Sequence, residues 1–473
     1  MMIHELSAQE LAQAVRSKQL SAVEVADHTL RRAEALSDDV GAFVAVTPDY
    51  ALEQARRLDA SLATGDAEES PLLGVPCPIK DLNAVAGLPL EFGSATMKGN
   101  VSKHTDGVVT LLTQGGTVVV GKTSTPEYGF PCYTEPDNAP PSRTPWDRSR
   151  SAGGSSGGAA AAVAAKIVPI AQASDGGGSI RIPASCCGLV GLKPSRGRVS
   201  HGPYGFPGAG LTTNGVLTRN VRDTALALDV ISTVPVGEVF HVEAPHTSFL
   251  AACEVDPGQL KIGMLTKPII ADTNVHPAPL EAVHATALQL ESLGHIVEEA
   301  PVPMRVEQWD AFAALWSVGA SSIPVTAQKE PLLRPLTRWL REQGRKVSGD
   351  AYAAALVASQ RLARRIAQAW HRYDIILTPT LAAPPAKIGE LRNDDDPQAD
   401  FAAQTRFTPW TSVYNVSGLP AISLPLHTSI IDGVELPIGV MIGGRFGAEA
   451  LLLSVAAQLE AATLLAPRAP QNI

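Results

Sequence analysis

The chain has 473 residues, of which 45% are hydrophobic and 18% charged, a composition that supports a large buried core and excludes a mainly disordered chain. Its formal net charge is −9 with no basic cluster to offset it, which argues against nucleic acid as the main partner. The five cysteines lack metal-ligand spacing and the sequence has no apolar signal core or membrane-length apolar run, so we expect a reduced, cytoplasmic protein with no metal and no membrane partner.

Short amphipathic helices are predicted at the start of the chain. Ser7 with Glu10, and Ser21 with Glu24, have the spacing of capping boxes, in which a serine oxygen accepts a hydrogen bond from the backbone N–H three residues later. An all-helical start is therefore predicted to about residue 62.

From residue 74 onward, short β-type runs alternate with helical stretches. In chain order, the pattern predicts a helix at 108–114, a strand at 117–120, a helix at 157–165, strands at 167–173 and 260–265, a helix at 279–293, a mostly helical interval at 309–370, strands at 375–377, 421–424 and 436–442, and a helix at 448–461. Such alternation predicts an α/β fold with a central mixed, largely parallel sheet covered by helices. Without a repeat or flexible linker, one large domain over 1–473 is expected, with a helical N-terminal segment at about 1–65, a core at about 70–235 and a variable helical region at about 300–370.

Two serines lie in glycine-rich segments 24 positions apart. Ser155 belongs to Gly-Gly-Ser-Ser-Gly-Gly at 153–158, and Ser179 ends Asp-Gly-Gly-Gly-Ser at 175–179. Glycine has no side chain that would block access to its backbone N–H. Such N–H groups can stabilise the oxyanion that develops when a neighbouring serine attacks a carbonyl. The predicted helix between them carries the chain roughly 14 Å away and the following strand brings it back, so both serines are expected at one end of this unit.

Lys80 is the candidate base for these serines. It follows the apolar run Val-Pro-Cys-Pro-Ile at 75–79, and a desolvated lysine can be neutral enough to take a proton from a hydroxyl. Its pKa would have to fall by about three units from ~10.4. Taken alone, such a lysine is more often a surface residue at the end of a strand, and glycine-serine runs are more often loops.

Taken together, these segments resemble the signature of the amidase signature family. The resemblance rests on 152–195 and on three further motifs in the family's order, at 121–129, 373–380 and 417–425. It implies a serine amide hydrolase without a cofactor. In that family pattern, Lys80 is the base, Ser155 is the serine that follows a cis peptide bond, and Ser179 is the nucleophile that forms an acyl-enzyme. The resemblance is weakest at 235–350, where the family varies with substrate.

Residues around the two serines receive supporting roles. The backbone N–H groups expected to hold the oxyanion are those of Gly176, Gly177, Gly178 and Ser179. Asp175 and Arg181 are predicted to form an ion pair that brackets this loop, with surface solvation as the alternative. Ser156 either hydrogen-bonds within the relay or caps the helix that follows it.

The family includes glutaminase subunits of tRNA-dependent amidotransferases, fatty-amide and aryl-acylamide hydrolases, cyclic-dimer amide hydrolases and urethanases. Ile182 stands where the glutaminases typically carry Gln, and Gly176 where they tend to carry Thr, so the resemblance favours the aryl-acylamidase, cyclic-dimer and urethanase branch. Small apolar or aryl amides, and also carbamates, are the expected substrates. Candidate pocket residues are Phe130, Cys132 and Tyr133, together with Trp316 and Trp410, for which core packing is the alternative. Acyl length and quaternary state, including a homodimer, are left open.

Two motif matches point to other functions. Segment 116–123 fits the P-loop pattern and would make Lys122 a phosphate ligand, but a P-loop needs a helix at the lysine and its intervening residues here predict a strand. Segment 153–157 fits the Gly-x-Ser-x-Gly elbow of α/β-hydrolases, yet residues 145–150 do not predict the buried strand that precedes such an elbow. We therefore reject nucleotide binding, and keep an α/β-hydrolase-type esterase and a glutaminase subunit as rival hypotheses.

Overall fold

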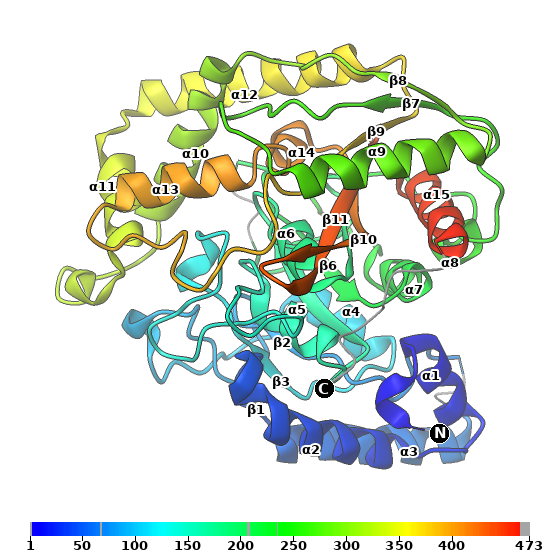
Figure 1. Cartoon of the computed structure of the whole chain (residues 1–473). Helices are drawn as coiled ribbons and strands as arrows, with labels where there is room; N and C mark the ends of the chain where they lie inside the picture. Colours follow the sequence, from blue (N-terminus) through cyan, green and yellow to red (C-terminus); the bar gives the residue numbers. More distant parts are fainter. Residues whose placement is uncertain (1, 67–68, 206–208, 234, 464–473) are drawn as a thin grey trace.

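The computed structural model describes residues 2–66, 69–205, 209–233 and 235–463. The described chain forms two β-sheets surrounded by helices (Figure 1). The smaller sheet has the strand order β1-β3-β2, in which β1 runs antiparallel and β2 parallel to the central strand. Its strands are β1 (Phe43–Val46), β2 (Ile79–Lys80) and β3 (Gly121–Thr123).

The N-terminal segment contains three helices, drawn in blue in Figure 1: α1 (Ala8–Arg16), α2 (Ala22–Val40) and α3 (Pro48–Thr64). Both predicted capping boxes are present, because Ser7 accepts a hydrogen bond from the N–H of Glu10, and Ser21 accepts one from that of Glu24. The prediction of an all-helical start is wrong at β1. This strand lies between α2 and α3 and pairs with β3, about 75 residues away along the chain, a partner that local sequence patterns do not reveal.

The larger sheet has eight strands in the order β4-β6-β5-β10-β11-β9-β7-β8. They are β4 (Ile170–Asp175), β5 (Val190–Lys193), β6 (Thr213–Thr218), β7 (Lys261–Met264), β8 (Ile296–Glu299), β9 (Ile375–Pro379), β10 (Ala421–Ile431) and β11 (Val434–Gly444). The predicted α/β class and mixed sheet are confirmed.

The prediction of a largely parallel sheet is wrong. Within the described residues, β7 is parallel to β8 and to β9, whereas the other five neighbouring pairs are antiparallel. Parallel neighbours need a crossover connection, which α9 (Pro277–Ser292) supplies between β7 and β8, while β10 and β11 are joined by a tight hairpin. Alternation of helices and strands along the chain does not specify which strands become neighbours.

The remaining helices cover the sheets or form the helical region at 310–370, where α10, α11 and α12 pack together in the upper part of Figure 1. They are α4 (Gly107–Gln114), α5 (Gly157–Ala164), α6 (Arg181–Cys187), α7 (Val221–Ile231), α8 (Phe249–Ala252), α10 (Asp310–Ser321), α11 (Pro335–Lys346), α12 (Gly349–Trp370), α13 (Pro397–Phe407), α14 (Val413–Ser417) and α15 (Glu449–Ala462). No helix in the described ranges is long and apolar enough to cross a membrane.

Helix α5 packs against both sheets. All of its residues are buried, and it packs against β4 of the larger sheet and against all three strands of the smaller one. Small side chains allow this close approach; at Gly158 a Cβ would lie 2.3 Å from the backbone nitrogen of Ser124. The glycine-alanine sequence of α5 therefore brings the segment that precedes it next to β2.

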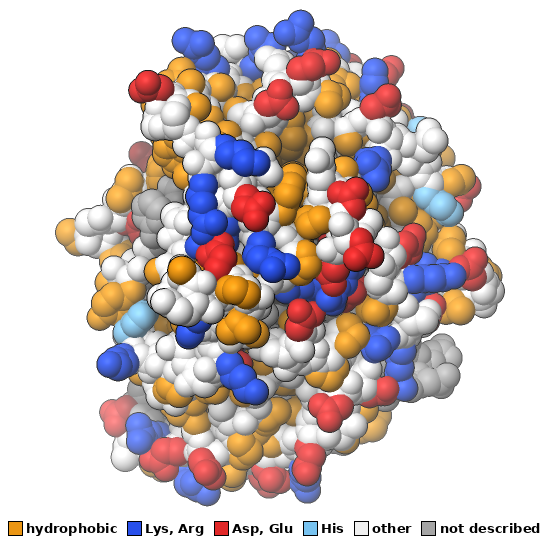
Figure 2. Space-filling view, turned by 90° about the vertical axis from the view of Figure 1, so that its left-hand side faces the viewer, with side chains coloured by type: hydrophobic (Ala, Val, Ile, Leu, Met, Phe, Trp, Pro, Cys, Tyr) orange, Lys and Arg blue, Asp and Glu red, His pale blue; other side chains and the backbone are white. Residues whose placement is uncertain are grey.

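The surface on the side of α11 and α13 is chemically mixed. Figure 2 shows Lys and Arg side chains interspersed with Asp, Glu and apolar side chains on this face, without an extended basic area. A surface of this kind has no single-sign field that would guide a highly charged polymer to this face.

Candidate active site

Lys80 lies at the end of β2 and is fully buried. Its backbone N–H donates to Gln172 Oε1 at 3.0 Å, which fixes the end of the strand against β4. Its Nζ lies 2.7 Å from Ser155 Oγ, 2.8 Å from Ser156 Oγ and 3.2 Å from Ser174 Oγ. The amine is thus held by neutral hydroxyl groups from both glycine-rich segments.

The surroundings of Lys80 favour its neutral form. Burial lowers the pKa of Lys80 to about 7, although the Asp175 carboxylate opposes part of that shift. Ser156 Oγ donates its own proton to the carbonyl of Ser174 at 3.2 Å, so it can only accept from the amine. A neutral amine that donates to Ser156 and Ser174 keeps one lone pair, which the Ser155 hydroxyl is placed to fill.

Ser155 and Ser156 belong to the turn that enters α5. The peptide bond between Gly154 and Ser155 is cis, as expected. A Cβ at Gly154 would come within 2.7 Å of the Tyr133 backbone, so only glycine fits there. Ser156 is the N-cap residue of α5 but its side chain makes no capping bond, since the hydroxyl is committed to Lys80 and Ser174.

The loop after β4 carries Ser179 and three glycines. Gly178 has a φ of +136°, and a Cβ there would lie 2.5 Å from Thr411 Oγ1. Contrary to expectation, the N–H of Gly178 is not free, because it donates to Asp175 Oδ1 at 2.8 Å. In the described chain the N–H groups of Gly176, Gly177 and Ser179 have no hydrogen-bond partner, so these three are the available oxyanion donors.

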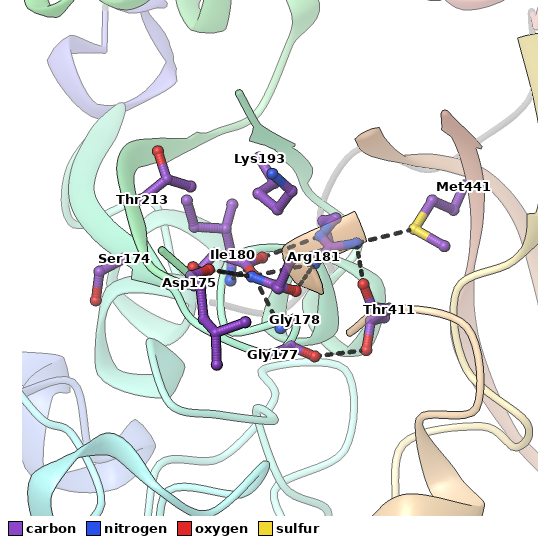
Figure 3. A network of polar contacts seen from close by, with 12 residues as sticks. Ser174, Asp175, Gly177, Gly178, Ile180, Arg181, Lys193, Thr213, Thr411 and Met441 are labelled. Carbon is purple, nitrogen blue, oxygen red and sulfur yellow. Dashed lines mark hydrogen bonds and ion pairs between the residues drawn. The ribbon is translucent and has the colours of Figure 1, made fainter. Parts of the chain in front are cut away.

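A buried ion pair shapes this loop (Figure 3). Arg181 Nε lies 3.0 Å from Asp175 Oδ2, Arg181 Nη2 lies 2.9 Å from Asp175 Oδ1, and neither side chain is exposed to solvent. Burial by itself would raise the pKa of Asp175, but Arg181 and a hydrogen bond from Asn415 hold it at about 2. The carboxylate therefore stays charged and orients the loop through the N–H groups of Gly178 and Ile180.

Two residues of this network were not identified from the sequence. Asn415 donates to Asp175 Oδ1 at 2.8 Å and accepts from Arg181 Nη2 at 2.8 Å. Thr411 accepts from Arg181 Nη1 through its carbonyl at 2.7 Å, and its hydroxyl donates to the Gly177 carbonyl at 2.8 Å (Figure 3). The one sequence signal was their position just before the motif at 417–425.

Lys193 is a second buried lysine behind the loop (Figure 3). Its Nζ donates to the carbonyl of Pro194 at 2.7 Å. Burial lowers its pKa to about 7, and the nearby Arg181 acts in the same direction. Lys193 belongs to the recognised segment 152–195, but no role was predicted for it.

A pocket of about 470 Å³ opens beside Ser179. It is lined by Phe130, Pro131, Cys132, Gly177, Ser179, Ile182, Ile270, Trp309, Phe312, Trp316, Phe401, Gln404, Thr405, Thr408 and Ser412. Three of the expected pocket residues, Phe130, Cys132 and Trp316, are among them. Tyr133 and Trp410 are not: Tyr133 is buried and its hydroxyl donates to Asp400 Oδ2 at 2.6 Å, while the Trp410 indole N–H donates to the Lys267 carbonyl at 3.0 Å.

One wall of the pocket is aromatic. Phe312 and Trp316 are one turn apart on α10, with ring centroids 5.3 Å apart, and Phe130 packs edge-on against Trp316 at 5.4 Å. Among the described lining residues there is no Asp, Glu, Lys or Arg. An uncharged pocket with an aromatic wall favours neutral, apolar or aryl groups.

The Lys122 segment does not form a phosphate cradle. Lys122 is fully buried, and its Nζ donates to Asp81 Oδ1, to the Asn83 carbonyl and to the Pro89 carbonyl, each at 2.9 Å. It lies in strand β3 and not at the start of a helix. The strand predicted at 117–120 is displaced to 121–123, with only an isolated bridge at Val118.

Two other expectations bear on rival chemistries. Leading into Ser155, the described chain has turns and an isolated bridge at Ser151 in place of a strand, which removes the structural basis of an α/β-hydrolase elbow. No group of three or more His, Cys, Asp or Glu side chains in the described part of the chain is arranged to hold a metal ion.

Comparison with known proteins gives consistent matches. The sequence model of the family described as Amidase matches residues 24–453. A putative amidase of Synechocystis sp. is 38% identical over 461 residues, covering 96% of this chain and 88% of the relative. The 6-aminohexanoate-cyclic-dimer hydrolase of Paenarthrobacter ureafaciens is 35% identical over 483 residues, covering 97% of this chain and 95% of the relative.

Solved structures agree over the full length. A 6-aminohexanoate cyclic dimer hydrolase superposes with a TM-score of 0.91 at 32% identity, covering 100% of this chain and 99% of the other. A bacterial aryl acylamidase of the amidase signature family superposes with a TM-score of 0.86 at 26% identity, covering 98% of each chain.

Proposed function

The chain belongs to the amidase signature family of amide hydrolases, and on that premise we propose that it cleaves small apolar or aryl amides through a Ser179–Ser155–Lys80 relay and an acyl-enzyme. The observation that carries this proposal is the 2.7 Å contact between the buried Lys80 amine and Ser155 Oγ, in a setting where the pKa of Lys80 falls to about 7. With a pKa of about 7, roughly half of the Lys80 amine is neutral at pH 7 and can act as a general base.

In the first half of the reaction, Lys80 takes the proton of Ser155 while Ser155 takes that of Ser179. The Ser179 oxygen forms a bond to the amide carbon, and the carbonyl electron pair moves onto its oxygen. The N–H groups of Gly176, Gly177 and Ser179 are the donors for that oxyanion. The Asp175–Arg181 pair keeps the loop in shape, since Asp175 also accepts the hydrogen bond of the Gly178 N–H.

In the second half, the proton returns from Lys80 through Ser155 to the amide nitrogen. The carbon–nitrogen bond breaks and the amine leaves in neutral form, which leaves an ester on Ser179. Water then repeats the sequence: it gives a proton to the relay, attacks the ester carbon, and releases the carboxylic acid as Ser179 recovers its proton. No metal or organic cofactor is needed to balance either half.

One link of the relay is open in this structure. In the described chain, Ser155 Oγ has its contact with Lys80 but makes no hydrogen bond with Ser179 Oγ. Catalytic hydrogen bonds are often long in a protein without substrate and commonly shorten when substrate binds.

The pocket supports a substrate preference within the family. The Phe130, Phe312 and Trp316 wall would bury one aryl group, contributing roughly 2–3 kcal/mol, or about a 30- to 150-fold preference over a small polar substrate. Carbamates present a similar carbonyl to the same donors, so aryl carbamates are included in the proposal. Glutamine has a charged ammonium and carboxylate, and the described pocket lining has no charged side chain for either.

A labelling and substrate experiment tests this proposal. A fluorophosphonate should add one adduct to the peptide that contains Ser179, and an acetanilide-type amide should be hydrolysed faster than glutamine at equal concentration, with a phenyl carbamate measured alongside. Labelling of Ser155 or Ser156 instead would overturn the nucleophile. Glutamine as the best substrate would restore the amidotransferase-subunit hypothesis.

A further inference from the structure

The hydroxyl and amide side chains that line the pocket differ in whether they are already hydrogen-bonded. Thr405 and Thr408 donate to the carbonyls of Phe401 and Gln404 one turn earlier on α13, each at 2.9 Å. Gln404 accepts from the N–H of Cys132 at 2.8 Å and donates to Asp400 at 2.5 Å. The donor protons of both threonine hydroxyls are therefore engaged, and only their acceptor lone pairs remain for a ligand.

Ser412 is different. It precedes α14 as its N-cap residue, yet its side chain makes no capping bond, and in the described chain its hydroxyl has no hydrogen-bond partner. The residue is only 5% exposed and lines the pocket. Its oxygen is not one of the fully buried atoms that lack a partner, so it is accessible from the pocket and can hydrogen-bond to a polar group of a bound molecule.

The position of Ser412 relative to the oxyanion loop is defined by Gly177. A Cβ on Gly177 would lie 3.8 Å from Ser412 Cβ, 3.9 Å from Phe312 Cζ and 4.0 Å from Trp316 Cη2. Ser412 and the aromatic wall therefore approach the same point of the loop. Trp316 faces the loop with the Cζ3 and Cη2 edge of its ring, which is the edge remote from its indole N–H. The hydroxyl of Thr411 is already bonded to the Gly177 carbonyl, so Ser412 supplies an uncommitted hydroxyl near this point.

In the proposed mechanism, both polar ends of the scissile amide already have partners. Its carbonyl is held by the loop N–H groups, and its nitrogen receives a proton from Ser155. We propose that Ser412 binds a second hydrogen-bonding group of the substrate, so that the preferred substrates are amides whose apolar part also carries a polar group, such as a second amide. This inference rests on the proposed function, because it assigns the reacting amide to Ser179.

Matched substrate pairs test the role of Ser412. One pair varies the acyl side: the 4-nitroanilides of hexanoic acid and of N-acetyl-β-alanine have main chains of equal length, and only the second carries an extra amide. The other pair varies the amine side: the acetamides of 4-isopropylaniline and of 4-aminobenzamide differ by an isopropyl and a carbamoyl group of similar shape. For each substrate, kcat/KM of Ser412→Ala is compared with that of the unmodified protein, so that differences in leaving-group reactivity cancel.

For the polar member of at least one pair, Ser412→Ala should lower kcat/KM about five- to tenfold, mainly through KM, with less than a twofold change for the apolar member. Ser412→Thr, which keeps the hydroxyl, should retain most of the activity. Thr405→Val is the matched control, since it removes a pocket hydroxyl whose proton already donates to a backbone carbonyl. It should change kcat/KM by the same factor for both members of each pair. Fluorophosphonate labelling of Ser179, measured in each of the three variants, reports separately whether the nucleophile is still reactive.

The inference is overturned if Ser412→Ala leaves kcat/KM unchanged for every substrate, or lowers kcat/KM by the same factor for both members of both pairs. Failure of the unmodified protein to hydrolyse any of the four substrates or to react at Ser179 would instead count against the proposed function. The two failures are thus distinguishable.

Discussion

Lys80 and Lys122 are buried lysines on neighbouring strands of the small sheet, and they differ in one respect. Lys122 pairs with the Asp81 carboxylate at 2.9 Å, whereas Lys80 contacts hydroxyl groups and has no carboxylate within ion-pair distance in the described chain. Burial lowers the pKa of both amines, but at Lys122 the adjacent Asp81 opposes the shift directly. The kind of partner decides whether a buried lysine is a structural cation or a base.

The difference follows from the geometry of an extended chain. Ile79 is paired with Lys122, and Lys80 with Thr123. Lys80 and Lys122 thus point to opposite faces of the small sheet, and Asp81 follows in the turn after β2. The carboxylate next to Lys80 in sequence is therefore turned away from it and meets Lys122 on β3, which runs parallel to β2. Lys80 is left on the face that meets Ser155 and Ser156.

The largest expected effect is on catalysis, in Lys80→Met. This substitution removes the base, and it replaces a buried amine that has no carboxylate partner with an apolar group of similar length. The protein should therefore remain folded. We expect kcat/KM for an aryl amide to fall about 10³-fold or more, because only binding and the oxyanion donors are left. The measurement is steady-state kinetics together with a thermal unfolding curve. Near-normal turnover, with activity instead abolished by a His→Ala substitution, would contradict the relay.

The complementary substitution, Lys122→Met, should act on stability. It leaves the Asp81 carboxylate buried without its cation, which costs about 3–5 kcal/mol in the free energy of unfolding. Urea unfolding measures this loss. Adding Asp81→Asn to Lys122→Met removes the buried carboxylate charge that has lost its partner, and should recover part of the free energy of unfolding. If Lys122→Met were as stable as the unmodified protein while losing activity a thousandfold, the roles assigned to the two lysines would have to be exchanged.

A third substitution is designed to make Lys80 resemble Lys122. In the unmodified protein, the proposal predicts that kcat/KM falls about tenfold per pH unit below the Lys80 pKa of about 7, because the protonated amine cannot act as a base. Ser174→Asp places a carboxylate close to Nζ, where the serine hydroxyl now lies at 3.2 Å. The carboxylate stabilises the charged amine, so the pH at which kcat/KM begins to fall should rise by one unit or more, with at least about a fivefold loss of kcat/KM at pH 7.

Lys193→Met is the control for that experiment. Burial also lowers the pKa of Lys193 to about 7, so it titrates in the same range as Lys80. Its amine donates a hydrogen bond to the Pro194 carbonyl and has no contact with the serines. The pH at which kcat/KM begins to fall should therefore be the same in this variant as in the unmodified protein. If the fall of kcat/KM below pH 7 disappeared in Lys193→Met, the titrating group would be Lys193 and not Lys80.

Sequence reasoning identified what is local. Lys80, the two glycine-rich serine segments and the approximate bounds of most elements follow from composition, glycine placement and residue spacing. Sheet direction, the burial of Tyr133 against Asp400 and the capture of the Gly178 N–H by Asp175 depend on contacts between segments far apart in the chain or on backbone dihedral angles. Asn415 and Thr411 were missed for the same reason, since they lie more than 200 residues from the loop that they stabilise.

The smallest expected effect concerns Lys122 and nucleotides. The sequence around Lys122 matches the P-loop pattern letter for letter, so nucleotide binding is the sharpest alternative to a structural role. In the structure the three hydrogen atoms of its ammonium are matched by one carboxylate and two carbonyl oxygens, and none is left for a phosphate. The N–H groups of Thr117, Val118 and Val119 before it already donate to the Leu112 carbonyl, the Val75 carbonyl and Gln54 Oε1, so they do not form a cradle for a phosphate. ATP at millimolar concentration, with or without Mg²⁺, should therefore leave the midpoint of thermal unfolding unchanged and give no calorimetric heat of binding. A saturable stabilisation that Lys122→Arg reduces would show that the amine exchanges Asp81 for phosphate, and the contrast between the two lysines would then have to be redrawn.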